Sequence, residues 1–161
     1  MIINQAVILC GGKGTRLNNL TKKTPKPLLK INKTPFIEYL INNLSRHGIK
    51  EIILLCGYLG HKFISKYHNK SFSGVKIICI KETKELGTGG AVINAFKKLD
   101  KVFYLLNGDT YFDVNLNLLS SQFNFKKYDM LMCCAELNKD VSRYSKINLN
   151  RQTVKSISTN N

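Results

Sequence analysis

The fold of this chain is decided by Leu9-Cys10-Gly11-Gly12-Lys13-Gly14-Thr15-Arg16-Leu17 and by Pro25-Lys26-Pro27-Leu28, which follows after a short polar insert. The first stretch begins at the end of the apolar run 6–9, which is the position expected for a loop that follows a buried strand. Its glycines leave a backbone whose N–H groups can approach an anion closely. Lys13, Arg16 and Lys26 place cations around this loop. The two stretches therefore predict a strand followed by a cradle for a polyphosphate.

Spacing excludes two common phosphate-binding motifs. A Walker loop that ended in Gly12-Lys13 would need glycine at position 7, where Val7 stands. The dinucleotide-binding fingerprint, started at Gly12, would need a small residue at position 17, where Leu17 stands. The polyphosphate cradle is thus of another kind.

Composition indicates a single globular domain of 161 residues with a formal net charge of +15. The charge raises the possibility of nucleic-acid binding, but the lysines are spread along the chain and are not interleaved with aromatic residues. Small anionic substrates therefore fit better, and we expect neither nucleic acid nor membrane as a partner. The cysteines form no CxxC pair, which favours reduced, buried thiols in a cytoplasmic protein.

Apolar runs alternate with helical stripes along the chain. This order predicts an α/β fold with a doubly wound, mostly parallel sheet and helices on both faces. Strands are expected at 2–9, 51–56, 75–80, 102–106 and 130–135, with a hairpin of 146–149 and 154–158. Helices are expected at 35–48, 61–67, 88–99 and 116–125, with Thr88 as an N-cap.

Three polar or glycine-rich segments follow strands of this predicted sheet. The glycine loop follows the first strand, residues 82–90 follow the third, and Asn107-Gly108-Asp109 follows the fourth. Ligands of such sheets bind at the carboxyl ends of the strands, so we expect these segments to converge on one site. A carboxylate beside bound phosphates suits magnesium, which makes Asp109 the candidate metal ligand.

The motifs resemble the signature of the sugar-1-phosphate nucleotidyltransferases, also called nucleotide-sugar pyrophosphorylases. Leu86-Gly87-Thr88-Gly89-Gly90-Ala91 and Leu106-Asn107-Gly108-Asp109 are similar to two further motifs of that family, in the same order. The resemblance runs from Ile3 to about Asn148. It is greatest to the guanylyltransferases that act on mannose-1-phosphate or on D-glycero-D-manno-heptose-1-phosphate.

The resemblance implies a Rossmann-like, GT-A-like domain that transfers GMP from GTP to a sugar-1-phosphate. Pyrophosphate would be released with the help of Mg²⁺ and without a covalent enzyme intermediate, and the nucleotide-sugar would serve surface polysaccharide synthesis. The Gly87–Gly90 loop resembles guanine-accepting versions, so GTP is favoured over other triphosphates. Glu82 is either an acceptor of hydrogen bonds from a guanine edge or a surface glutamate.

The resemblance also assigns roles to single residues. Arg16 would stabilise the β- and γ-phosphates, and Lys26 would bridge the α-phosphate and the sugar phosphate, which makes these two the catalytic residues. Lys13 is either a further phosphate ligand or a solvated surface lysine. The implied nucleotide-binding residues are Leu9, Gly11, Gly12, Gly14, Thr15, Glu82, Gly87, Thr88, Asn107 and Gly108. The implied sugar-binding residues are Arg143 and Tyr144.

The chain departs from the family pattern in two places. Ser145 stands where relatives have the glycine of Arg-Tyr-Gly. The sequence also ends before the family's Glu-Lys pair and its second magnesium-binding aspartate, so we expect one domain over 1–161, truncated relative to the family. Two functions stay open: a sugar-1-phosphate nucleotidyltransferase, or a nucleotide-binding protein without turnover. Assembly into a homo-oligomer is also left open.

Overall fold

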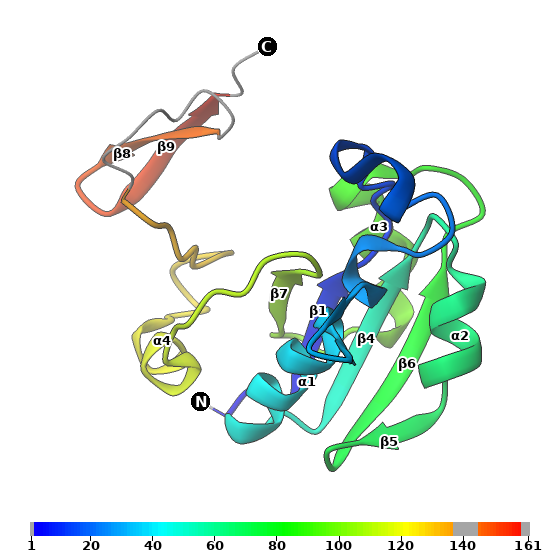
Figure 1. The fold of residues 1–161 in the computed structure, drawn as a ribbon. Helices are drawn as coiled ribbons and strands as arrows, with labels where there is room; N and C mark the ends of the chain where they lie inside the picture. Colours follow the sequence, from blue (N-terminus) through cyan, green and yellow to red (C-terminus); the bar gives the residue numbers. More distant parts are fainter. Residues whose placement is uncertain (1, 137–144, 159–161) are drawn as a thin grey trace. The chain divides into compact units, whose positions relative to one another are not determined.

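The computed structural model describes residues 2–136 and 145–158 and divides into two units, Met1–Lys127 and Tyr128–Asn161 (Figure 1). Within these residues, no helix has both the length and the apolar character needed to cross a membrane. The first unit contains the central sheet. The second contains a hairpin of β8 (Lys146–Asn150) and β9 (Thr153–Ser158), which confirms the hairpin predicted there.

The central sheet has five strands in the order β5-β6-β4-β1-β7. Their bounds are β1 (Gln5–Leu9), β4 (Glu51–Cys56), β5 (Lys70–Phe72), β6 (Val75–Lys81) and β7 (Tyr104–Asn107). All neighbours are parallel except β5 and β6, which form an antiparallel hairpin. The strand β1 lies between β4 and β7, with Leu9 opposite Leu55 on one side and Asn107 on the other. The predicted doubly wound sheet is confirmed.

Helices and short turns connect the strands. The α-helices are α1 (Phe36–Arg46), α2 (His61–Tyr67), α3 (Gly87–Asn94) and α4 (Leu116–Gln122). The 3-10 helices are η1 (Thr15–Leu20), η2 (Lys26–Leu28) and η3 (Phe96–Lys98). The segment between η2 and α1 contains a small two-stranded ladder of β2 (Lys30–Ile31) and β3 (Thr34–Pro35).

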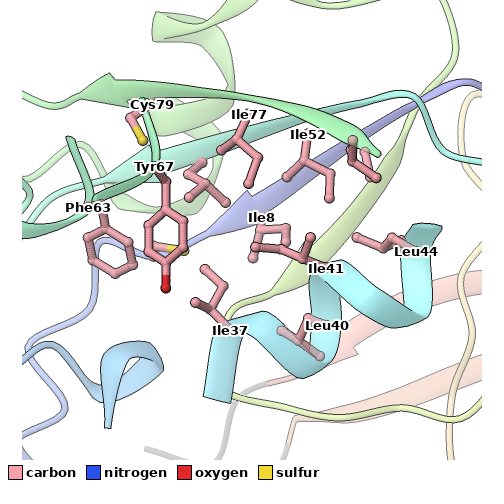
Figure 2. Packing of buried hydrophobic residues seen from close by; sticks show 14 of the residues in the cluster. Ile8, Ile37, Leu40, Ile41, Leu44, Ile52, Phe63, Tyr67, Ile77 and Cys79 are labelled. Carbon is pink, nitrogen blue, oxygen red and sulfur yellow. The ribbon is translucent and has the colours of Figure 1, made fainter. Parts of the chain in front are cut away.

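The larger core lies between the sheet and the helices α1 and α2 (Figure 2). Successive side chains of a strand point to opposite faces of the sheet. Ile8 of β1, Ile52 of β4 and Ile77 of β6 all point to the face that α1 and α2 cover. Against them α1 packs a stripe at helical spacing, which consists of Ile37, Leu40, Ile41 and Leu44. The helix begins at Phe36, directly after Pro35, which occupies the N-cap position in an extended conformation.

A second, smaller core covers the opposite face of the sheet. Val7, Ile53 and Leu55 are almost fully buried there against Ala91 and Ala95. Because β1 and β4 are covered on both sides, every residue of their central parts is apolar, and this gives the continuous runs seen in the sequence.

One buried carboxylate ties α1 to α2. Glu38 accepts hydrogen bonds from the Tyr67 hydroxyl and from the Lys66 ammonium, each 2.7 Å long. Burial, and then this hydrogen bond, raise the pKa of Tyr67, so the phenol stays a donor across the physiological range. The contact fixes α2, whose preceding loop supports the glycine loop.

Three sequence-based expectations are wrong. Residues 130–135 form no strand, because an apolar run pairs only where a neighbouring strand is available, and these residues are mostly exposed. The helix expected over 88–99 changes to the 3-10 helix η3 after Asn94, which leaves Phe96 75% exposed. Thr88 is not an N-cap, since α3 already begins at Gly87, with Leu86 in the capping position.

The cysteines follow the expectation in part. All five are free thiols. Cys10, Cys56 and Cys79 are buried at the carboxyl end of the sheet, whereas Cys133 is half-buried and Cys134 exposed, because the strand expected around the last two is absent.

The core predicts a large cost for truncating Ile8. Replacing Ile8 with alanine should lower the free energy of unfolding by about 2–5 kcal/mol, because the side chain is fully buried between the sheet and α1. The matched control is Ile93→Ala, at a residue that is 74% exposed and should change stability by no more than about 0.5 kcal/mol. Urea denaturation followed by circular dichroism measures both, and equal losses would contradict this packing.

Candidate nucleotide-binding site

The candidate site is a pocket of about 470 Å³ at the carboxyl ends of the strands. It lies where the loops after β1, β6 and β7 meet. The chain adds β4 and β6 on one side of β1 and then β7 on its other side, so the strand order reverses at β1. In doubly wound folds this switch point is the usual place for a ligand. The pocket is lined by Leu9, Cys10, Gly11, Gly12, Lys13, Gly14, Lys26, Pro27, Glu82, Glu85, Gly87, Thr88, Ala91, Asn107 and Asp109. The convergence expected from the sequence is confirmed.

Close backbone contacts hold the glycine loop on the sheet. The Gly11 carbonyl oxygen accepts the N–H of Tyr58 at 3.1 Å, and a Cβ on Gly57 would lie only 2.8 Å from this oxygen. A Cβ on Gly11 would lie 2.9 Å from the Glu82 carboxylate. Position 57 therefore requires glycine, because the added atom would meet backbone, whereas a Cβ at position 11 would only displace the end of the Glu82 side chain. Gly57 was not singled out from the sequence, because nothing local indicates that the loop after β4 crosses under the loop after β1.

The far end of the loop is fixed by Gly14 and Thr21. Gly14 has a φ of +63°, a left-handed conformation that glycine adopts without strain. Its carbonyl oxygen accepts the buried Thr21 hydroxyl at 3.1 Å, and this hydroxyl also reaches the Asn18 carbonyl at 3.2 Å. The chain then turns into η1, so Thr15 and Arg16 are exposed and do not line the pocket.

Gly108 joins the loop after β7 to β1. Its N–H donates to the Leu9 carbonyl oxygen at 2.9 Å, and a Cβ here would lie 2.7 Å from that oxygen and 3.0 Å from Cys10 Sγ. Gly108 is therefore required for packing, and it is not among the residues that line the pocket. The contact brings Asp109 to the edge of the glycine loop.

Lys26 and Asp109 form an ion pair across the pocket. The Lys26 Nζ atom lies 2.8 Å from Asp109 Oδ2, and the side chains are 38% and 43% exposed. Partial burial alone would raise the pKa of the Asp109 carboxyl, but the hydrogen bond and charge of Lys26 outweigh it and hold that pKa below its usual range. The structure thus brings together the two residues expected to carry catalysis and metal binding.

A second ion pair crosses the pocket between Lys13 and Glu85. It joins the glycine loop to the segment after β6, and the hydrogen bond and charge of Glu85 raise the pKa of Lys13. Lys13 lines the pocket, but its side chain is 56% exposed, so both alternatives, a phosphate ligand and a solvated surface lysine, stay open. Glu85 was not predicted from the sequence. The only indication there is its negative charge, in a loop that was expected to lie opposite the basic glycine loop.

Glu82 places a carboxylate beside Gly11. Its N–H continues β6 by donating to the Cys56 carbonyl oxygen at 2.9 Å. Its Oε2 atom accepts the Leu86 N–H at 3.3 Å, which holds the segment ahead of α3 in place. Gly87 follows with a φ of +67° and opens the helix from which Thr88 and Ala91 line the pocket. Glu82, Gly87 and Thr88 therefore lie where the sequence predicted them.

Most of the predicted nucleotide-binding residues line the pocket: Leu9, Gly11, Gly12, Gly14, Glu82, Gly87, Thr88 and Asn107. Thr15, Arg16 and Gly108 do not. Arg143 and Tyr144, expected to bind the sugar, lie outside the residues that the structure describes. Cys10, Pro27, Glu85 and Ala91 also line the pocket and had no predicted role. Burial raises the pKa of Cys10 well above its ordinary value, so this thiol is not an activated nucleophile.

Asp109 can supply one carboxylate to a metal ion but not a complete set of ligands. Magnesium is commonly held by one or two carboxylates together with substrate phosphates and water. The part of the chain that the structure describes contains no group of three or more His, Cys, Asp or Glu side chains arranged to hold a metal. The donor set therefore fits a cation that is bound by Asp109 and by the phosphates of a ligand.

The mostly parallel sheet with helices on both faces, and a glycine loop and a lysine–carboxylate pair at its switch point, place this domain in the doubly wound α/β class. The chain belongs to the nucleotidyl transferase family, whose model matches residues 5–158.

Comparison with known proteins adds relatives of stated activity. The chain is 39% identical over 148 residues to a D-glycero-α-D-manno-heptose 1-phosphate guanylyltransferase of Campylobacter jejuni, with 92% of this chain and 64% of the relative covered. It is 34% identical over 144 residues to the enzyme of the same name from Aneurinibacillus thermoaerophilus, with coverage of 89% and 62%. The chain thus spans less than two thirds of these relatives.

A solved structure shares the fold. HddC from Yersinia pseudotuberculosis, in a crystal structure complexed with GMP-PN, is 30% identical and superposes with a TM-score of 0.74. The match covers 97% of this chain and 69% of HddC.

The crossing of the two loops predicts that Gly57 tolerates no side chain. Gly57→Ala should lower the free energy of unfolding by about 1–3 kcal/mol, because the added Cβ meets the Gly11 backbone. Gly12→Ala is the matched control, since a Cβ on Gly12 meets nothing within 4 Å. Thermal unfolding of both variants tests the contact, which is refuted if Gly57→Ala melts at the wild-type temperature.

Proposed function

We propose that the chain transfers GMP from GTP to a sugar-1-phosphate and releases pyrophosphate. The observation that carries the proposal is the Lys26–Asp109 pair at the edge of a glycine-lined pocket. The names of the two relatives support guanylyl transfer and favour D-glycero-α-D-manno-heptose 1-phosphate as acceptor. Mannose-1-phosphate is the second candidate, by resemblance to the family. We place the reaction in the cytoplasm, where thiols such as the free cysteines of this chain stay reduced.

The proposed chemistry needs positioning and charge neutralisation more than covalent work by the protein. An oxygen of the sugar phosphate attacks the α-phosphorus of GTP, and pyrophosphate leaves in line. The backbone of residues 11–14 receives the phosphates, and the Lys26 ammonium binds between the α-phosphate and the attacking phosphate. By resemblance to the family we assign Arg16, the second residue of η1, to the distal phosphates and the leaving pyrophosphate, which then lie beyond the lining of the pocket on the side of η1.

Asp109 would hold a magnesium ion through its carboxylate. When bound, magnesium neutralises negative charge on the phosphates. The neighbouring Gly108–Leu9 hydrogen bond fixes the backbone from which this carboxylate extends, so the ligand is presented beside the glycine loop. The proposed sugar-binding residues are Arg143 and Tyr144, by resemblance to the family.

Guanine recognition is assigned to Glu82. Guanine presents two adjacent donors, N1–H and the amino group, and a carboxylate can accept both. The Glu82 carboxylate lines the pocket and is held beside Gly11 and Leu86. The Gly87–Gly90 segment offers a backbone surface against which a flat base can lie.

The transfer reaction predicts pyrophosphate release from GTP and heptose-1-phosphate or mannose-1-phosphate in the presence of Mg²⁺. Lys26→Ala and Asp109→Ala should each lower turnover by at least about 100-fold, because each removes a charge that faces the reacting phosphates. Lys76→Ala should not, since Lys76 pairs with Glu51 on the sheet and does not line the pocket. A coupled pyrophosphate assay measures all four proteins.

Two results would change the assignment. Near-native turnover in both site variants would show that the reaction occurs elsewhere. Thermal stabilisation by GTP without pyrophosphate release from either sugar phosphate would favour the second candidate, a nucleotide-binding protein without turnover.

Base selection predicts a separate effect at Glu82. Glu82→Gln should raise the KM for GTP about tenfold or more and leave the KM for ATP within about threefold, because glutamine offers one acceptor and an unsuitable donor to the guanine edge. Glu85→Gln is the control, a carboxylate in the same loop that pairs with Lys13. An unchanged ratio of kcat/KM for GTP over ATP in Glu82→Gln would remove Glu82 from base recognition.

A further inference from the structure

Both oxygens of the Asp109 carboxylate are engaged within the protein. Oδ2 lies 2.8 Å from the Lys26 ammonium, and Oδ1 accepts the Thr110 hydroxyl at 3.2 Å. A divalent cation at Asp109 would have to share Oδ2 with a lysine ammonium only a hydrogen-bond length away. Like charges at that distance repel strongly, so the cation and the ammonium compete for one carboxylate.

The rest of the pocket offers a cation little compensation. Within residues 2–136 and 145–158 no group of three metal-binding side chains exists, so most ligands of a cation at Asp109 must come from outside the protein. Phosphate oxygens are hard ligands of the required kind, and they also attract a lysine ammonium. A phosphate in the pocket can thus bind the Lys26 ammonium and the cation at Asp109 at the same time.

Lys26 is placed to change partners. It belongs to the short helix η2, and a Cβ on Gly14 would lie only 3.2 Å from Lys26 Cβ, so the base of its side chain lies against the glycine loop. Its ammonium meanwhile reaches Asp109 on the loop after β7. Rotation of a half-exposed, flexible stem is enough to move the ammonium from the carboxylate to an anion above the loop.

We propose that Lys26 couples anion binding to metal binding: its ammonium blocks Asp109 until a phosphate of the nucleotide takes the ammonium and frees the carboxylate for a divalent cation. The identity of the anion as a nucleoside triphosphate rests on the proposed function. The competition between Lys26 and the cation for Asp109 does not depend on that function. Metal and nucleotide then bind with positive cooperativity, and neither binds tightly alone.

The first experiment uses Mn²⁺ alone as the probe, followed by the relaxation rate of water protons. Lys26→Met should bind Mn²⁺ on the order of tenfold more tightly than the wild type, because the competing charge is gone. The gain should vanish in the double variant Lys26→Met/Asp109→Asn, which lacks the carboxylate. The matched control is Lys76→Met, which removes a lysine paired with Glu51 at 3.2 Å outside the pocket and should leave Mn²⁺ binding unchanged.

The second experiment measures GTP binding in EDTA by equilibrium dialysis. Asp109→Asn should bind metal-free GTP more tightly than the wild type, because Lys26 is released to the phosphates. Loss of repulsion between Asp109 and the phosphates also contributes, so the gain is compared with that of the same substitution in the Lys26→Met background. A larger gain in the presence of Lys26 isolates the switch.

The outcomes separate the two proposals. Mn²⁺ affinity that is unchanged or weaker in Lys26→Met overturns the competition, as does tight Mn²⁺ binding that survives in the double variant. Equal gains in GTP affinity with and without Lys26 overturn the transfer of the ammonium to the phosphates. Failure of GTP to stabilise the wild-type protein even with Mg²⁺ refutes the proposed function, while the Mn²⁺ result still tests the ion pair.

Discussion

The site depends on the hydrogen bond from the Gly108 N–H to the Leu9 carbonyl oxygen. This bond continues the pairing of β1 with β7 past the last strand residue, so the glycine loop and the loop that bears Asp109 leave the sheet side by side. Together with the pairing of β1 and β7, it brings the Asp109 carboxylate within reach of the Lys26 ammonium, 83 residues away in the sequence. The chemistry of the pocket is thus a consequence of how two parallel strands end.

The electrostatics of the pocket differ from those of the chain as a whole. The protein has a net charge of +15, yet three of its ten acidic residues, Glu82, Glu85 and Asp109, line this one pocket. Each is held by a donor of the protein: the Leu86 N–H, Lys13 and Lys26, respectively. The net positive charge attracts anions to the protein, and the local ion pairs fix the positions of the Lys13 and Lys26 ammonium groups before an anion binds.

The sequence predicts most where a single segment determines its own structure. The bounds of β4 and α2 match the prediction, because one is an uninterrupted apolar run and the other a short amphipathic stripe between turns. What was missed depends on contacts between distant segments: Gly57 under Gly11, and Glu85 opposite Lys13. The strand expected at 130–135 failed for the same reason, since apolar residues indicate a tendency to pair and not the presence of a partner.

The motif Asn107-Gly108-Asp109 shows why a motif and a site are different things. Its three residues are adjacent in the sequence, but only the first and third line the pocket. Gly108 is present because any side chain there would meet the Leu9 carbonyl oxygen and the Cys10 thiol. A motif therefore combines residues that touch a ligand with residues that allow the backbone to reach it, and only packing distinguishes them. Substituting the second kind removes the site by moving it, and this would look like the loss of a ligand contact unless stability were measured too.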